Sequence, residues 1–262
     1  MLSFTDLLGS VRAAGDETTS VDVPEDWMQG RTVYGGLSAA LALDAALRIA
    51  PDAGPLRSAL VSFIGPADGG FEFQASVLRA GRSVRHVAVD GFSGGKIAIR
   101  CAFVFGAARP SIFDEHHAPA PAVRPPEECP PLLPRDQGPS FVRHYDARLA
   151  AGAGPVSGSE ASDHLVWVRH RDAAATGLVA LVALGDMPPP AMLARFPEPA
   201  PISSITWMLN ILRAPEEREA EWRLMRTWAE DAREGYSSQD MAVWDKDGRP
   251  IATGRQSVAL FL

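Results

Sequence analysis

Two apolar stretches of the chain have the length and continuity of buried helices. Residues 37–50 are interrupted only by Ser38 and by one acid–base pair. That pair, Asp44 and Arg48, has the i,i+4 spacing of a single solvated stripe. Residues 173–184 contain no charged side chain at all. A helix that is apolar on nearly every side must be enclosed, so the pattern predicts two helices that are each wrapped by other elements.

Alternating apolar and polar positions follow the first of these helices and predict a sheet. The strand-like segments are 56–64, 71–78, 84–90 and 97–105, and glycine-rich turn signals separate them. The side chains expected to face inward fall at period two: Phe71, Phe73, Ala75, Val77, Ile97, Ile99, Cys101 and Phe103. A buried helix followed by an antiparallel meander is an α+β unit in which the sheet curls around the helix.

The second half of the chain repeats this plan. Strand-like segments 141–145 and 165–169 precede the second helix, and segments 202–213, 222–228, 236–244 and 251–262 follow it. The turns at 231–235 and 245–248 correspond in order to those at 79–82 and 93–95. A short amphipathic helix with Phe4, Leu7, Leu8 and Val11 on one face is expected to open the chain.

A proline-rich segment separates the two copies. Nine of the chain's 22 prolines fall in residues 107–139, and proline favours extended coil. We therefore expect an N-terminal domain over 1–106, a linker that crosses a surface over 107–139, and a C-terminal domain over 140–262. His116 and His117 lie in this linker without partners at metal-ligand spacing, so no metal site is predicted.

Composition narrows the function classes. The net charge of −7 without a run of Lys or Arg argues against nucleic acid or an anionic membrane as a partner. Two cysteines, Cys101 and Cys129, form no disulfide framework, and no signal-like or membrane-spanning stretch is present. A cytoplasmic protein is the expectation.

Asp186 is the first candidate functional residue, because it directly follows the second apolar helix. A helix C-terminus and apolar surroundings both disfavour the ionised form of a carboxylate, so such a residue has an unusual pKa if it is buried. The alternative is an exposed Gly-Asp turn, in which Asp186 is merely solvated. Gly35 and Gly36, directly before the first helix, would let a backbone or a ligand approach the free N–H groups at its N-terminus.

The order of these segments resembles the type II acyl-CoA thioesterase family. The similarity lies in RTVYGG before the first helix, LRSALVSFIGPAD and VLRAGRSVRHVAVDGFSGGKIAI after it, and, in the second half, LVWVRHR, LGD, ISSITWMLNILR and DGRPIATGRQSVALFL. In that family each half is a hotdog domain, a curled antiparallel sheet around a long helix. The resemblance implies a double hotdog that hydrolyses acyl-CoA to free acid and CoA in fatty acid metabolism.

The family's hydrolytic residues map onto Asp186, Ser204 and Gln256, which together would hold a water molecule. The resemblance also makes Gly35 and Gly36 candidate substrate-binding residues. Trp207 is a third, because it stands where many members continue with an Asp-His pair after the hydroxyl residue. The N-terminal half lacks an Asp of its own and is interpreted as a degenerate copy. The resemblance implies no cofactor, because CoA is part of the substrate, and it allows a homodimer or higher homo-oligomer.

The chemistry expected of these residues is attack of water on a thioester. Asp186 would accept the proton, Ser204 and Gln256 would orient the water, and N–H groups of the helix after Gly36 would bind the oxyanion. An acyl-Asp186 intermediate is the alternative route. Two other functions stay open: a hotdog hydratase or dehydratase, which would pair Asp or Glu with His, and a non-catalytic acyl-CoA-binding protein. The acyl chain length is not predicted.

Overall fold

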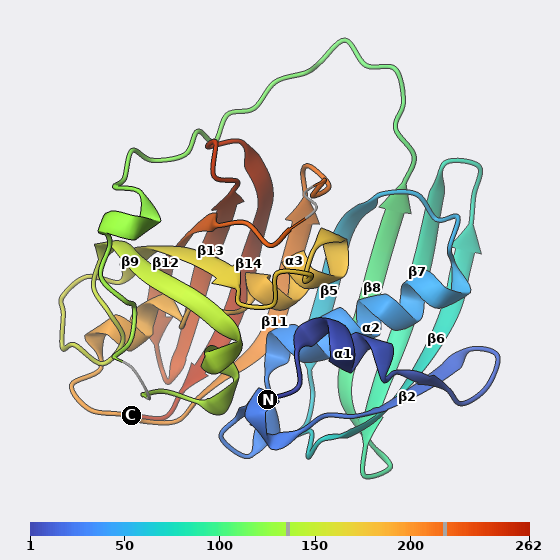
Figure 1. The fold of residues 1–262 in the computed structure, drawn as a ribbon, viewed down its shortest axis with the longest axis horizontal. Coiled ribbons are helices and arrows are strands. Elements are labelled where there is room, and N and C mark those ends of the chain that lie inside the picture. The colour runs from blue at the N-terminus through green and yellow to red at the C-terminus, as the bar shows by residue number, and fades with distance from the viewer. Residues whose placement is uncertain (135–136, 217–218) are drawn as a thin grey trace.

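A computed structural model describes residues 1–134, 137–216 and 219–262 of the chain (Figure 1). Its main element is a 12-stranded antiparallel sheet with the order β1-β2-β6-β7-β8-β5-β11-β14-β13-β12-β10-β9. The strands are β1 (Arg12–Ala13), β2 (Thr18–Asp22), β5 (Leu56–Phe63), β6 (Gly70–Ala80), β7 (Val84–Ser93), β8 (Lys96–Gly106), β9 (Tyr145–Gly152), β10 (Asp163–His170), β11 (Ile202–Ile211), β12 (Arg223–Arg233), β13 (Tyr236–Trp244) and β14 (Pro250–Leu260). A separate hairpin pairs β3 (Met28–Gln29) with β4 (Thr32–Val33).

The sheet has an internal two-fold plan centred on the pair β5–β11. From this pair the order runs β5-β8-β7-β6-β2 in one direction and β11-β14-β13-β12-β10 in the other. Ion pairs repeat the plan: Asp90–Arg100 joins β7 to β8, and Asp240–Arg255 joins β13 to β14. The predicted α+β class and the repeated helix-plus-meander are confirmed.

The helices α1 (Phe4–Gly9), α2 (Gly35–Ile49) and α3 (Gly177–Gly185) complete the fold. Helix α2 packs against β6, β7, β8 and α3, so the curled sheet covers it as its apolar sequence requires (Figure 1). Helix α3 is shorter than the apolar stretch 173–184. It begins at Gly177, whose φ of +78° is incompatible with a continuous right-handed helix, and residues 173–174 form a turn before it. Short 3₁₀ helices lie at Glu25–Trp27, Pro126–Glu128, Ser140–His144 and Ala191–Arg195.

The strand predicted over 141–145 is wrong. Residues Ser140–His144 form a 3₁₀ helix, and strand β9 begins only at Tyr145. The i,i+3 spacing turns Phe141 and His144 to the same side, where Phe141 stacks on Tyr34 at 3.9 Å and His144 stacks on Trp27 at 3.6 Å between ring centroids. These aromatic contacts bind the start of the C-terminal half to the N-terminal half.

Two smaller expectations are also corrected. Val77 was expected to face inward but is 39% exposed; it keeps the register of Ala75, and the pairing of β6 with β7 shifts only after it, between Val77 and Arg79. The turn predicted over 231–235 is confined to Glu234 and Gly235, which both have positive φ, and β12 extends to Arg233.

The linker is a packed part of the C-terminal half over much of its described length. The indole N–H groups of Trp167 and Trp244 donate to the carbonyls of Arg124 and Ala118 at 2.9 and 2.8 Å. Cys129 is buried, and the backbone N–H of Leu132 donates to the carbonyl of Ala147 in β9. Hence the linker does not simply cross the surface, and the domain boundaries at 106 and 139 stay a prediction. No helix of the described residues is long and apolar enough to span a membrane.

Candidate active site

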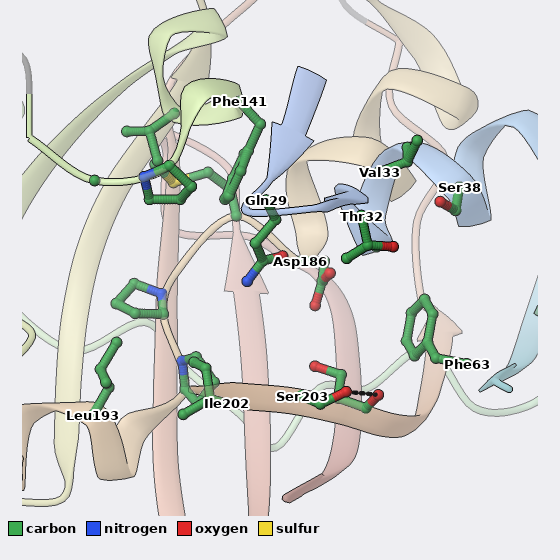
Figure 2. Close-up of a pocket in the computed structure, with 18 of the residues that line it drawn as sticks. Gln29, Thr32, Val33, Ser38, Phe63, Phe141, Asp186, Leu193, Ile202 and Ser203 are labelled. Carbon is green, nitrogen blue, oxygen red and sulfur yellow. Dashed lines mark hydrogen bonds between the residues drawn. The ribbon is translucent and has the colours of Figure 1, made fainter. Parts of the chain in front are cut away.

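Asp186 lies where the two helices meet. It caps the C-terminus of α3, and its carboxylate faces the N-terminus of α2 (Figure 2). The carboxylate accepts hydrogen bonds from the backbone N–H of Gly36 and from Nε2 of Gln256, the latter at 2.5 Å. Asp186 is only partly exposed and lines a cavity, so the solvated-turn alternative is wrong.

Gly35 and Gly36 are needed for the close approach of α2 to α3. A Cβ on Gly35 would lie 2.7 Å from Oδ2 of Asp186. A Cβ on Gly36 would clash with the hydroxyl of Tyr34 and lie 2.5 Å from the carbonyl oxygen of Ala183. Gly35 lines the cavity, but Gly36 is absent from the described lining. Gly36 contributes to the site through its backbone N–H, which donates to the Asp186 carboxylate. Substrate binding by either glycine stays a prediction.

Two tyrosines support the same junction and were not found by sequence reasoning. The hydroxyls of Tyr34 and Tyr145 both donate to the carbonyl oxygen of Ala183, at 2.7 and 3.3 Å. Burial raises the pKa of both phenols well above the usual value, so they stay protonated donors. They satisfy a buried carbonyl in the last turn of α3, directly before Asp186.

The surroundings of Asp186 tune its proton affinity. Burial raises the pKa of Asp186 to about 7, and the hydrogen bonds from Gln256 and Gly36 partly oppose this rise. A carboxyl group with such a pKa is available both as a base and as an acid near neutral pH.

Gln256 belongs to a pair of inward-facing amides. It lies opposite Gln239 across β13 and β14, and Nε2 of Gln239 donates to Oε1 of Gln256 at 2.7 Å. Gln239 in turn accepts from the backbone N–H of Ala191 at 2.8 Å. Sequence reasoning missed Gln239, although the alternation in β13 carried a signal: Ser237, Gln239 and Met241 are all buried, which puts a polar amide at an inward position.

A β-bulge turns Ser204 into the cavity. On β11, Trp207 pairs with Gln256 and Thr206 with Ser257, but Ser204 pairs with Val258, so Ile205 is the extra residue. Strict alternation from the inward-facing Trp207 would direct Ser204 outward, and the extra residue reverses this. Ser204 therefore lines the cavity together with Asp186 and Gln256, and the structure brings all three predicted catalytic residues to one site.

Trp207 is placed differently from the prediction. It is 1% exposed, its Nε1 donates to Sδ of Met241 at 3.1 Å, and it does not belong to the described cavity lining. A Cβ on Gly185 would lie 3.1 Å from the indole ring. The side chain thus packs beneath the end of α3, because it shares the inner face of the sheet with Gln256. The structure therefore gives no support to substrate contact by Trp207, which stays a prediction.

The cavity has a volume of about 920 Å³ and is largely apolar. Asp186 is the one charged side chain among the described residues that line it, and no histidine is among them. The lining comes from both halves and from the linker, and includes Gln29, Thr32, Phe63, Phe71, Ile99, Leu132, Leu133, Phe141, Val142, Pro188, Pro189, Pro190, Leu193, Ile202 and Ser203 (Figure 2). Such a space suits a long apolar group next to one reactive polar group.

The N-terminal half has no equivalent polar pair. The ion pair Asp90–Arg100 takes the place in the first half that Asp240–Arg255 has in the second. The cross-strand pair next to it is Val89 and Cys101 in the first half, and Gln239 and Gln256 in the second. Val89 and Cys101 are both buried, and burial raises the pKa of the Cys101 thiol. The interpretation of the first half as a degenerate copy stays a prediction. No group of three His, Cys, Asp or Glu side chains that could hold a metal ion occurs among the described residues.

Comparison with known proteins identifies relatives over most of the chain. Residues 126–260 match the family "Acyl-CoA thioesterase C-terminal domain", and residues 23–106 match the family "Acyl-CoA thioesterase N-terminal domain". No curated protein matches the chain.

Solved structures show the same fold. A conserved protein of unknown function with a hot dog fold from Alicyclobacillus acidocaldarius is 25% identical, with a TM-score of 0.88 over 98% of this chain and 97% of that one. The acyl-CoA thioesterase II TesB2 of Mycobacterium marinum is 19% identical, with a TM-score of 0.76 over 97% and 96%. The tesB protein of Mycobacterium avium subs paratuberculosis is 15% identical, with a TM-score of 0.79 over 99% and 100%. The chain therefore has the predicted double hotdog fold.

Proposed function

Because the chain belongs to the acyl-CoA thioesterase family, we propose that it hydrolyses acyl-CoA thioesters by means of a water molecule that Asp186 deprotonates. The observation that carries this mechanism is the junction of α2, α3 and β14. There the carboxylate of Asp186 faces a largely apolar cavity and is held by Gln256 and by the N–H of Gly36.

The acyl group lies in the apolar cavity, with its thioester carbonyl beside Asp186. The water is held between Asp186 and the hydroxyl of Ser204, a side chain that can both donate and accept. Asp186 takes a proton as the water oxygen attacks the carbonyl carbon, and the C–S bond then breaks to release the CoA thiolate. The proton held by Asp186 passes to the departing thiolate or to solvent, so the carboxylate is regenerated.

The oxyanion requires N–H donors that no protein group already occupies. The N–H of Gly36 is bonded to Asp186, and the N–H of Ser38 donates to the carbonyl of Tyr34. The first turn of α2 also offers the N–H groups of Gly35 and Leu37, which have no partner within a helix. We assign the oxyanion to this turn, where the helix dipole adds a favourable positive potential.

Two alternatives are weaker in this site. A hydratase or dehydratase that pairs Asp with His would need a histidine in the cavity, and the described lining has none. A non-catalytic binding protein would not need a buried carboxyl whose pKa is raised to about 7 by its surroundings. The cytoplasmic location, the link to fatty acid metabolism, independence of a cofactor and self-association stay predictions that accompany this proposal.

The test is a release assay for free CoA thiol across acyl chains of increasing length and across aromatic acyl groups. We expect hydrolysis of at least one acyl-CoA, with kcat rising with pH through a midpoint near the Asp186 pKa of about 7. If no acyl-CoA releases thiol although equilibrium dialysis shows that it binds, the chain is a binding protein. A kcat that is independent of pH between 5 and 9 would contradict the role of Asp186.

A further inference from the structure

We propose that Gln239 is a positioning residue that fixes the side-chain amide of Gln256, so that its Nε2 and not its Oε1 faces Asp186. The inference rests on the proposed function, because Asp186 must present a carboxylate to water. Gln239 itself is 2% exposed and is not part of the described cavity lining, so it does not touch the substrate.

The direction of the hydrogen bonds carries the argument. The chain of bonds begins at the backbone N–H of Ala191, which donates to Oε1 of Gln239 at 2.8 Å. A backbone N–H can only donate, so the Oε1 of Gln239 must point to Ala191 and its Nε2 must point to Gln256. That Nε2 then donates to Oε1 of Gln256 at 2.7 Å, and Nε2 of Gln256 donates to Asp186 at 2.5 Å. One fixed donor thus sets the orientation of both amides.

The backbone around Ala191 is suited to this role. Pro188, Pro189 and Pro190 precede it, and proline has neither an N–H group nor a free φ. Ala191 therefore provides the first backbone donor after Met187, at the start of a 3₁₀ helix, and it is fully buried. The residue that directly follows the three prolines is therefore hydrogen-bonded to Gln239, and through Gln239 and Gln256 it is connected to Asp186.

The N-terminal half has apolar side chains at the positions that correspond to Gln239 and Gln256. The residue that corresponds to Gln239 is Val89, and the partner that corresponds to Gln256 is Cys101. An apolar pair fills the same inner face there without any hydrogen-bond requirement. A buried amide without hydrogen-bond partners destabilises the fold, so two amides at these positions need the complete chain of bonds.

Other groups around Asp186 do not supply the same donor. The N–H of Gly36 is the second donor to the carboxylate, and the neighbouring titratable groups are Tyr34 and Tyr145. Both phenols are protonated at neutral pH and donate to Ala183 instead. If Gln256 turns its Oε1 towards Asp186, the carboxylate loses one of two donors and faces a negative dipole, so its pKa rises.

The experiment compares Gln239→Glu and Gln239→Leu with the wild type. The glutamate keeps the side-chain volume and an acceptor for Ala191, but its ionised form can only accept from Gln256 and so reverses that amide. We expect kcat at pH 7 to fall about tenfold, an energy of about 1.4 kcal/mol, with KM changed less than twofold and the acid limb of kcat shifted to higher pH. Gln74→Leu, on the exposed face of β6, is the matched control.

A second readout does not depend on turnover. Carbon-13 NMR titration of the Asp186 carboxyl in the ligand-free protein should show a higher midpoint in both variants than in the wild type. An unchanged kcat together with an unchanged Asp186 midpoint overturns the proposal, and if Gln239→Leu fails to fold, Gln239→Glu decides. If the wild type hydrolyses no acyl-CoA, the proposed function fails, but the NMR titration still tests the role of Gln239.

Discussion

Gln256 donates a 2.5 Å hydrogen bond to Asp186 from a strand that lies 70 residues further along the chain. Together with the N–H of Gly36, this bond opposes the burial that raises the pKa of Asp186. The resulting pKa of about 7 is a balance between the two effects, so each partner of Asp186 has a measurable influence on the acid–base chemistry of the site.

Replacement of Asp186 by Asn should lower kcat at pH 8 by about 10³-fold or more, because the base is lost while the shape is kept. The measurement is thiol release under saturating acyl-CoA. Asp22→Asn, at an exposed strand end, serves as the control. Turnover within tenfold of the wild type would show that Asp186 is not the base.

The same Asp186→Asn variant should be more stable than the wild type at high pH. A carboxyl with a folded pKa of about 7, above its usual value of 3.8, stabilises the fold only while it is protonated. This contribution is complete below pH 4 and is lost as the pH rises to about 7, with a slope of about 1.4 kcal/mol per pH unit. Denaturant unfolding at pH 5 and pH 8 measures it, and an equal stability difference at both values would contradict the raised pKa.

Replacement of Ser204 by Ala should reduce kcat about tenfold or more if the hydroxyl orients the water, a loss of about 1.4 kcal/mol. Thr206→Ala is the matched control, because Thr206 lies on the same strand but on the exposed face. A loss below threefold for Ser204→Ala, or an equal loss in both variants, would remove Ser204 from the mechanism.

Replacement of Gly35 by Ala should mainly lower activity, whereas replacement of Gly36 by Ala should mainly lower stability. In Gly35→Ala the new methyl group would lie 2.7 Å from the Asp186 carboxylate, so we expect a loss of activity with a nearly unchanged melting temperature. In Gly36→Ala the methyl group meets the backbone carbonyl of Ala183, which cannot move independently of α3. A loss of about 1–3 kcal/mol of folding free energy is expected. Melting temperatures and kcat of the two variants separate these effects, and the reverse pattern would contradict the packing described.

His170 should make the protein sensitive to acid. Burial lowers its pKa to about 4, so the folded state does not accept the proton that the unfolded chain binds below about pH 6.5. Stability is therefore lost as the pH falls from about 6.5 to about 4, by about 1.4 kcal/mol per unit. His170→Phe should remove this contribution and leave that of His164, whose pKa burial also lowers to about 4. His117→Gln, in the exposed part of the linker, should leave the pH dependence of stability unchanged. Unfolding free energies at pH 4.5 and 7 provide the test.

Local patterns in the sequence determined the elements of this protein. The helix at 35–49 and the four strands that follow it were predictable because apolar residues recur with the period of each element and glycine-rich turns separate them. The repeated order of elements also predicted the two-fold plan. The same pattern singled out Asp186, because this carboxylate directly follows the second apolar stretch. Ser204 and Gln256 came from the resemblance to a family, since each has an ordinary local sequence.

Tertiary structure decided which polar groups meet. The bulge at Ile205 that directs Ser204 inward, the bond from Ala191 to Gln239, and the packing of Trp207 beneath Gly185 all depend on the register between segments far apart in the chain. Likewise Phe141 belongs to a 3₁₀ helix because its ring stacks on Tyr34 of the other half. The hydrophobic periodicity of the sequence indicates which face of a helix or strand is buried. Which side chains meet on that face is determined only when the sheet closes around both helices.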